Sequence, residues 1–522
     1  DHVIWQKDHS GEDITDTTVQ LLENDQIMDL CASCHSRRTE ITGDFVPGDK
    51  FLDHYIPIIP DETDIYFPDG QVNGENYESV SFFGSKMYDA KVSCRDCHAK
   101  GVMEKGNDLC NKCHDGKKAP LGSHSYHPEG TPGSYCVDCH MPETVFMQQD
   151  HRHDHGFTIP DPELTKNYGV PNACNRCHKD KSVDWSIDFV LQRYGDTSQR
   201  YSKQRARWIA KAREQDDSVV NSLKQMAQRE KNAYWRAVAV GLLKNWINDP
   251  DVFELIAEKS KDEHPLVRIN AARSLEPLVE MDNPMAIELL QNSLSDSMRS
   301  VRVEAAWALR SILDFDSSVG KELVSYLQFN ADQPTGALRL GILFMGRGDA
   351  SHALSYLERA TLWDPNSAPL RYAYAIGLGK AGQAEKAVEQ LEKACSIDPE
   401  DANLWFYFGL ALNETIRLDE AAESFKYATD LNPNFIRAWY NLGLAYRDLN
   451  QPEKAVLALE NAESLDPKLA YIPYARATIL ADMNQLDEAK KAVKTALGID
   501  TTYQQALHLL GFITQKEKNR LN

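Results

Sequence analysis

In the C-terminal part of the chain, the pattern of hydrophobic and polar positions repeats every 34 residues. Proline recurs at this step, at Pro365, Pro399, Pro433 and Pro467. Alanine keeps the same step, at Ala353, Ala387, Ala421, Ala455 and Ala489. Small residues suit a close crossing of two helices, and proline suits the end of the second helix. The pattern therefore predicts pairs of antiparallel helices that stack as an α-solenoid.

A step of 34 residues is typical of tetratricopeptide repeats, each of which contains two helices. The segment has room for five repeats and a closing helix around Tyr503–Gln515. An unrelated helical bundle would not keep these proline and alanine positions in one register. The sequence therefore predicts tetratricopeptide repeats over residues 331–522.

A looser repeat precedes this segment, over residues 196–330. Three similar stretches recur at steps of 32 and 34 residues, at Trp235–Ala239, Val267–Ala272 and Val301–Ala306. This spacing indicates HEAT-like helical pairs, with a generic helical connector as the alternative. The boundary with the first part of the chain is expected near Gly195–Arg200, after an amphipathic helix. Solenoids of this kind present long surfaces for binding and seldom perform chemistry.

Residues 1–195 show little helical periodicity. They are rich in Gly, Pro, Asp, His and Cys, and their segments are short and broken, as at Phe51–Pro60 and His124–Pro132. Such a segment needs something other than packed helices as its core. The chain is thus predicted to be mainly α. An irregular domain at 1–195 is followed by HEAT-like repeats at 196–330 and tetratricopeptide repeats at 331–522.

The cysteines indicate what this core is, because ten of the 11 lie between residues 31 and 177, in pairs followed directly by histidine. The motifs are Cys31-Ala-Ser-Cys34-His35, Cys94-Arg-Asp-Cys97-His98, Cys110-Asn-Lys-Cys113-His114, Cys136-Val-Asp-Cys139-His140 and Cys174-Asn-Arg-Cys177-His178. C-x-x-C-H is the signature of covalent c-type haem attachment. Two thiols one helical turn apart bind the vinyl groups of one haem, and the adjacent histidine binds its iron.

Zinc sites, disulfides and a redox C-x-x-C are the alternatives, and none of them requires a histidine after every pair. The sequence therefore predicts five covalently bound haem c groups. Their proximal ligands are expected to be His35, His98, His114, His140 and His178. The macrocycles would then form the core of the segment. Because Cys94 and Cys110 are 16 residues apart, at least two haems are expected to lie close together, which suits electron relay.

Each iron needs a second axial ligand or keeps an open coordination position. Eight histidines of this part lie outside the motifs, at His2, His9, His54, His124, His127, His151, His153 and His155. After His178 only three more occur, so the enrichment favours bis-His ligation of all five irons. The best positions are Asp53-His54-Tyr55, His124-Ser-Tyr-His127 and His153-Asp-His155, with His2 as a further candidate.

The charge balance narrows the choice of partners. Lys plus Arg number 57 and Asp plus Glu number 78, which gives a net charge of −21. This excess argues against nucleic acids and anionic membranes as partners, and no apolar stretch approaches the roughly 18 residues of a membrane span.

The chain begins at Asp1 and is expected to be a processed form or a fragment. Because thioether attachment takes place on exported proteins, a periplasmic or extracellular location is expected.

Taken together, the sequence resembles a bacterial family of multihaem c-type cytochromes with C-terminal HEAT and tetratricopeptide repeats. The resemblance covers nearly the whole chain. It is most specific at Cys31–Arg38, Phe51–Tyr55, Asp69–Gln71, Ser85–Met87, Cys136–Pro142, Asp154–Phe157 and Pro171–His178. It implies distal ligands at His54, His127 and His155, and less directly at His124. Longer members carry further motifs upstream, so His2 is expected either to serve one of these haems or to belong to a haem outside this chain.

Electron transfer is the favoured function, with the haems as a relay. The repeats would dock redox partner proteins or other haem proteins, or allow self-assembly. The alternative is a multihaem oxidoreductase that acts on a small nitrogen or sulfur compound at an open haem. Related reductases often replace one motif histidine by lysine, whereas all five motifs here end in histidine, and no catalytic residue is assigned. A subunit of an extracellular cytochrome filament is a third alternative.

The first segment and the repeats are expected to fold independently, because each has a core of its own. This expectation is weaker for residues 196–330, which follow the last motif closely. The opposing hypothesis is that the HEAT-like pairs cover a haem edge and exclude water from it.

Overall fold

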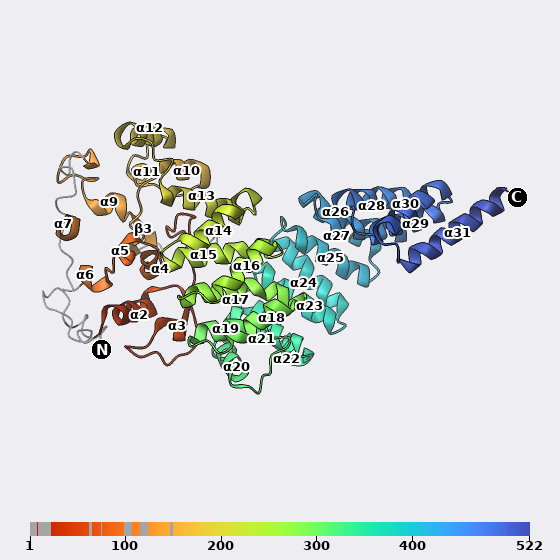
Figure 1. Ribbon diagram of the computed structural model, residues 1–522, viewed down its shortest axis with the longest axis horizontal. Coiled ribbons are helices and arrows are strands. Elements are labelled where there is room, and N and C mark those ends of the chain that lie inside the picture. Colours follow the sequence, from red (N-terminus) through yellow and green to blue (C-terminus); the bar gives the residue numbers. More distant parts are fainter. Residues whose placement is uncertain are drawn as a thin grey trace. The chain divides into compact units, whose positions relative to one another are not determined.

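The computed structural model describes residue 8 and residues 22–61, 65–74, 76–98, 107–114, 124–146 and 150–521. The chain forms two compact units, residues 1–329 and residues 330–522. Figure 1 shows short helices and loops in the first third of the chain and paired helices after it. None of the described helices is long and apolar enough to cross a membrane.

The first unit begins with an irregular part, residues 22–195, which we call the motif segment. Its helices are α2 (Asn24–His35), α3 (Phe51–His54), α4 (Glu78–Phe83), α5 (Lys86–Asp89), α6 (Cys94–His98), α7 (Asp108–His114), α9 (Cys136–His140), α10 (Pro162–Tyr168), α11 (Ala173–Cys177) and α12 (Val183–Tyr194). Its strands form two antiparallel hairpins, β1 (Arg38–Glu40) with β2 (Tyr55–Pro57) and β3 (Glu143–Phe146) with β4 (Asp150–His153). Glu40 lies opposite Tyr55, and Glu143 lies opposite His153.

Residues 201–329 complete the first unit with helices that pack in pairs. They are α13 (Tyr201–Arg213), α14 (Val220–Arg229), α15 (Ala233–Leu243), α16 (Pro250–Lys259), α17 (Pro265–Glu280), α18 (Pro284–Ser293), α19 (Arg299–Ala308) and α20 (Ser318–Phe329), with short 3₁₀ turns at Asp217–Val219 and Lys244–Trp246. Asp249 and Asn283 cap α16 and α18, each of which has proline in its first turn. Both features favour the start of a helix at these positions.

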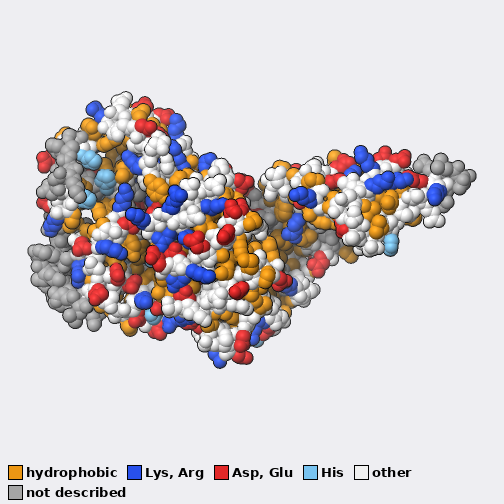
Figure 2. Space-filling model, viewed as in Figure 1, with side chains coloured by type: hydrophobic (Ala, Val, Ile, Leu, Met, Phe, Trp, Pro, Cys, Tyr) orange, Lys and Arg blue, Asp and Glu red, His pale blue; other side chains and the backbone are white. Residues whose placement is uncertain are grey.

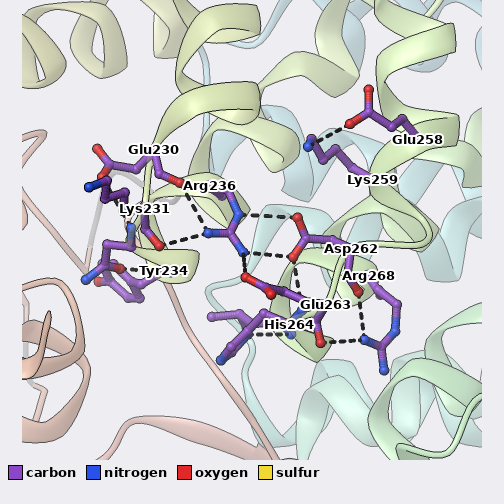
Figure 3. Close-up of polar contacts among 12 residues, drawn as sticks. Glu230, Lys231, Tyr234, Arg236, Glu258, Lys259, Asp262, Glu263, His264 and Arg268 are labelled. Atoms are coloured by element: carbon purple, nitrogen blue, oxygen red, sulfur yellow. Dashed lines mark hydrogen bonds and ion pairs between the residues drawn. The ribbon is translucent and has the colours of Figure 1, made fainter. Parts of the chain in front are cut away.

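Arginines at equivalent positions join successive helical pairs of this part (Figure 3). Arg236 of α15 forms an ion pair with Asp262, which precedes α17, at 2.9 Å. Arg268 of α17 pairs in the same way with Asp296, at 2.7 Å. The recurrence of arginine in the sequence repeat is explained by this contact, because each arginine holds the loop that leads into the next pair of helices.

The motif segment packs directly on the first helices of the repeats. Trp235 Nε1 donates a hydrogen bond to the carbonyl of Gly84 at 2.7 Å, and the Arg205 guanidinium lies 3.6 Å from the centre of the Trp235 ring. Asn232 donates to the carbonyl of Phe83 at 2.8 Å. A Cβ at Gly84 would lie 3.1 Å from the buried Trp235 ring, so glycine allows the close approach.

A buried lysine joins the same two parts at another point. Lys203 of α13 is only 1% exposed, and its Nζ lies 2.7 Å from Glu163 and 3.2 Å from Asp161. A buried cation requires such carboxylate partners, so α10 is fixed against α13. The motif segment was expected to fold without the HEAT-like repeats, whereas these contacts join the two parts.

The second unit consists of five antiparallel helix pairs and a last helix over the described residues 334–521. Its helices are α21 (Pro334–Gly346), α22 (Ala350–Trp363), α23 (Ala368–Lys380), α24 (Ala384–Ile397), α25 (Ala402–Glu414), α26 (Leu418–Leu431), α27 (Ile436–Asp448), α28 (Pro452–Leu465), α29 (Tyr471–Asp482), α30 (Leu486–Ile499) and α31 (Gln504–Leu521). This is the arrangement that the 34-residue step predicted.

The recurrent residues of the second unit have physical roles. Ala421 and Ala455 are fully buried at helix crossings. A Cβ at Gly443 would lie 2.7 Å from the Leu459 side chain, so α27 and α28 approach closely only because this position is glycine. The carbonyl of Pro433 accepts a hydrogen bond from Trp439 Nε1 at 2.9 Å, which joins the end of one pair to the start of the next.

Candidate haem-binding site

The motif cysteines lie one helical turn apart, as haem attachment requires. The end of α2 and the helices α6, α7 and α9 each hold both cysteines and the following histidine of one motif. In the last motif α11 ends at Cys177 and His178 occupies the C-cap. No disulfide joins any of the eleven cysteines, all of which lie in the described part of the chain. The thiols are therefore arranged to form thioethers to one group per motif.

Three pairs of imidazole rings face each other in the motif segment. They are His98 with His155, with ring centres 6.4 Å apart and planes at 23°, His124 with His140, at 6.2 Å and 15°, and His127 with His178, at 6.0 Å and 33°. Each pair joins a motif histidine to a histidine outside the motifs. Figure 2 shows histidine side chains gathered on the face that carries α9.

The ring separation fits an iron between two axial ligands. Two metal–nitrogen bonds of about 2.0–2.1 Å, with about 1.1 Å from each nitrogen to its ring centre, place the two rings about 6.2–6.4 Å apart. Two of the observed separations, 6.2 and 6.4 Å, lie in this range, and the third, 6.0 Å, lies about 0.2 Å below it. The residues present therefore fit bis-His haem. No group of three or more His, Cys, Asp or Glu is arranged to hold a bare metal ion in the described residues.

Hydrogen bonds fix the orientation of several of these rings. The Nδ1–H groups of His127, His140, His153 and His155 donate to the backbone carbonyls of Ser125, Thr158, Met141 and His153, at 2.7, 3.0, 2.6 and 2.8 Å respectively. A carbonyl can only accept, so Nδ1 carries the proton and Nε2 presents its lone pair. Histidines that bind metals commonly have their second nitrogen held in this way.

His35 differs from these because its acceptor is a carboxylate. Its Nδ1 lies 3.1 Å from Oε2 of Glu78, the first residue of α4. This hydrogen bond raises the pKa of His35, and burial opposes the rise. Burial raises the pKa of Glu78, but the hydrogen bond with His35, a backbone hydrogen bond and the charges of His35 and His155 together outweigh burial and lower that pKa. Glu78 is therefore ionised at neutral pH.

The first two motifs lie beside each other. Helix α2 packs against α6, and the Cys94 thiol donates a hydrogen bond to Sδ of Met28, in α2, at 3.6 Å. Burial raises the pKa of Cys97, and the charges of Asp96 and then Cys113 raise it further.

The last three motifs also lie near each other. The backbone N–H of Cys136, at the start of α9, donates a hydrogen bond to Oδ1 of Asn107, directly before α7, at 2.7 Å. Burial lowers the pKa of His140, a hydrogen bond to Thr158 opposes the effect, and the charges of His124 and His114 lower it further. Helix α9 packs against α11, and burial followed by the charge of Cys174 raises the pKa of Cys139 to about 11.

The other predicted distal ligands are not placed in such pairs. His54 is buried, and its Nδ1 lies 2.7 Å from Thr42 Oγ1. Its two ring nitrogens also lie 3.2 Å from Asp44 and Asp49 respectively. Its ligation therefore stays a prediction, and His2 lies outside the described residues. Among the described residues, neither His35 nor His114 stacks on a second histidine ring.

Two features of the site were not anticipated from the sequence. Glu78 is 43 residues away from His35, and no motif marks it as a partner. His153 was a candidate only as part of His153-Asp-His155. Its Nδ1–H donates to a backbone carbonyl, as the Nδ1–H groups of three paired histidines do. Successive side chains of a strand point to opposite faces, so a predicted strand would have placed His151 and His153 on one face and Arg152 on the other. It would not have shown which atoms accept the hydrogen bonds of the two histidines.

Comparison with known proteins supports this reading of the geometry. A family model described as cytochrome c552 matches residues 121–244, and one described as HEAT repeats matches residues 220–310 and 255–339. Models of the tetratricopeptide repeat match residues 372–434, 436–469 and 474–503. The chain carries a multihaem cytochrome domain with HEAT and tetratricopeptide repeats. Haem c is its implied cofactor.

Two curated relatives match parts of this multihaem cytochrome. "Multiheme cytochrome MtrA" of Shewanella baltica is 32% identical over 109 residues, which are 20% of this chain and 28% of the relative. "Cytochrome c nitrite reductase subunit NrfA" of Nitratidesulfovibrio vulgaris is 30% identical over 142 residues, which are 24% of this chain and 25% of the relative. The chain thus spans about a quarter of the length of the curated relatives that it matches.

Solved structures are similar to part of the chain. "Crystal structure of MamA" is 24% identical with a TM-score of 0.30, covering 31% of this chain and 95% of that one. "Crystal structure of YrrB: a TPR protein with an unusual peptide-binding site" is 19% identical with a TM-score of 0.32, covering 35% and 95%.

The order of the helices and the matches to the repeat models confirm the predicted fold class, which is mainly helical, with an irregular first part followed by helical repeats.

Proposed function

We propose that the motif segment relays electrons through five closely packed bis-His haem c groups, and that the repeats dock redox partners. The observation that carries this proposal is the three imidazole pairs, whose ring centres are 6.0–6.4 Å apart. Haem c supplies one-electron redox chemistry when bound. In each pair the two histidines would hold the iron of a bound haem and would leave it no coordination position for a substrate.

The order of the motifs supports a relay along the chain. Helix α2 of the first motif packs against α6 of the second, and α9 of the fourth packs against α11 of the fifth. The third and fourth motifs are joined by the hydrogen bond from the Cys136 N–H to Asn107 at 2.7 Å. Close approach of attachment points brings successive macrocycles together. Electrons would then pass between the first and fifth motifs, with partner proteins at either end.

A multihaem oxidoreductase acting on a small nitrogen or sulfur compound is the second candidate. The partial likeness to a cytochrome c nitrite reductase subunit favours it, as do His35 and His114, which stack on no second histidine among the described residues. Against it, all five motifs end in histidine, and His153 has its Nδ1 already fixed as a further ligand would. The carrier is therefore preferred.

The proposal places the protein in the periplasm or outside the cell, because covalent haem attachment takes place on exported proteins. The repeats would offer their surface to redox partner proteins, to other haem proteins or to further copies of the chain, including a filament of cytochromes. The net charge of −21 makes nucleic acids unsuitable partners.

Haem counting followed by ligand binding tests this function. Acid–acetone extraction of the full chain should leave five haems on the polypeptide, and release of the colour into the solvent would contradict covalent attachment. The oxidised protein is then mixed with cyanide, nitrite or hydroxylamine. A carrier with closed irons should show no spectral change, whereas saturable binding at one haem would favour the enzyme.

A further inference from the structure

Glu78 sets His35 apart from the other iron-binding histidines with a described Nδ1 partner. His127, His140 and His155 donate Nδ1–H to neutral backbone carbonyls at 2.7–3.0 Å. His35 donates to an ionised carboxylate at 3.1 Å. The acceptor at His35 therefore carries a full negative charge, whereas these three paired histidines face only a carbonyl dipole.

The surroundings of Glu78 hold this carboxylate in place. Its side chain is 22% exposed, so water screens it only in part. Arg152 Nε lies 3.8 Å from Oε1, the oxygen that does not face His35, and the Arg152 guanidinium stacks over Tyr77 at 5.1 Å. One oxygen is thus held by a cation from β4 while the other accepts from the imidazole. The rotamer that reaches His35 is fixed from two sides.

A carboxylate acceptor changes what the imidazole does to a metal. Drawing the Nδ1 proton away increases electron density at Nε2, so the ring becomes a stronger donor. A stronger donor stabilises ferric over ferrous iron and lowers the reduction potential, because second-shell hydrogen bonding is one of the means by which a protein tunes haem. The negative charge of Glu78 acts in the same direction.

We propose that Glu78 is a positioning residue that makes the haem of the first motif the low-potential end of the relay. The proposal rests on the proposed electron-transfer function. The first motif lies at one end of the order of motifs along the chain, and its helix α2 packs against α6 of the second motif. A low potential there makes electron flow downhill from the His35 motif towards the His178 motif, so the reducing partner docks near α2 and α4.

The test is a spectroelectrochemical titration of the full haem-loaded chain, comparing wild type with Glu78→Gln. The glutamine keeps the size of the side chain but removes the charge and weakens the acceptor. The lowest-potential component should move to higher potential while the other four stay in place. Glu143→Gln is the matched control, because Glu143 is an acceptor of the exposed His151, which belongs to no imidazole pair. It should leave every component unchanged.

Two results would overturn the proposal. One is an unchanged lowest component in Glu78→Gln, and the other is an equal shift in the Glu143→Gln control, which would show a general charge effect. If Glu78→Gln fails to load haem, Glu78→Asp is measured instead. Aspartate keeps the charge, but its shorter side chain weakens the hydrogen bond to His35, so the lowest reduction potential should still rise. An unchanged lowest potential in Glu78→Asp contradicts the role of Glu78. Haem count and low-spin signals are recorded on the same samples. If these are normal in wild type and only the shift is missing, the relay stands and the Glu78 role fails.

Discussion

At the scale of single residues, the chemistry depends on which imidazoles face each other. His98 and His155 are 57 positions apart in the chain, yet their rings stand 6.4 Å apart with nearly parallel planes. The Nδ1–H of His155 is fixed by the carbonyl of His153. Both features leave Nε2 free to bind an iron held by the Cys94–His98 motif.

Replacing His155 by methionine tests this assignment. Methionine in place of one axial histidine raises the reduction potential of c-type haem. His155→Met should therefore raise one of the five potentials and leave the protein low-spin. His151→Met is the control, because His151 is exposed and bonds only to Glu143 among the partners described. Equal redox titrations of wild type and His155→Met would contradict the assignment.

A second residue-scale prediction concerns a helix cap away from the haem motifs. Nδ1 of His264 accepts a hydrogen bond from the backbone N–H of Leu266 at 3.2 Å, which requires the neutral ring. Burial, and next the charge of Arg236, lower the pKa of His264. A histidine with a lowered folded pKa contributes stability that is complete above about pH 6.5 and is lost as the pH falls through the folded pKa.

Asparagine at this position caps a helix without titrating in that range. The melting temperature of wild type should therefore fall more steeply below about pH 6.5 than that of His264→Asn, by an amount that corresponds to a cap of about 1 kcal/mol. Parallel pH profiles of the two proteins would show that the cap does not titrate.

What the sequence could predict at this scale follows from how local the signal is. Each C-x-x-C-H motif lies within one helical turn, so the attachment residues could be named from spacing alone. The partner of each iron is a long-range contact. The sequence named His124, His127 and His155 as candidates, but it did not show which motif histidine each of them faces. His54 was selected by the same enrichment; its ring lies against Thr42 and two aspartates, and its ligation stays a prediction.

At the scale of elements, the repeats show why residue spacing alone predicted the helix pairs of the second unit. A helix crossing needs a small residue at the point of contact, and this need recurs with every repeat, so Ala421 and Ala455 are visible in the sequence. The irregular elements of the motif segment have no such recurrence. Their positions depend on single contacts such as the one between Trp235 and Gly84, which no sequence pattern predicts.

Two glycines of the second unit should respond oppositely to alanine. A Cβ at Gly443 would lie 2.7 Å from Leu459, whereas a Cβ at Gly379, also inside a helix, meets nothing within 4 Å. Gly443→Ala should lower the free energy of unfolding by about 1–3 kcal/mol through overpacking. Gly379→Ala should raise it by up to about 1 kcal/mol through reduced chain entropy. Denaturant unfolding followed by circular dichroism measures both, and equal effects would contradict the packing described.

At the scale of the whole molecule, the motif segment and the HEAT-like helices form one unit, residues 1–329. Trp235, Lys203 and Asn232 of the repeats each contact residues of the motif segment. The expectation of independent folding treated the haems as a sufficient core. It could not include these contacts, because they join residues that are 40 or more positions apart.

Truncation distinguishes the two views of this unit. Residues 1–329 should keep the haem content and potentials of the full chain, whereas residues 1–195 should lose haem or shift in potential, because the Trp235 and Lys203 contacts are missing. Haem per chain and redox titrations of the three forms provide the comparison. A fragment 1–195 with the full chain's haem content and potentials would restore the independent-folding view.

A closed electron relay is tested most directly by electron paramagnetic resonance of the oxidised full chain, with spins counted against haem per polypeptide. We expect five haems per chain, with low-spin signals from all five irons, because each iron would have two histidine ligands. A high-spin signal equal to one iron or more, in protein with its full haem content, would contradict a closed electron relay.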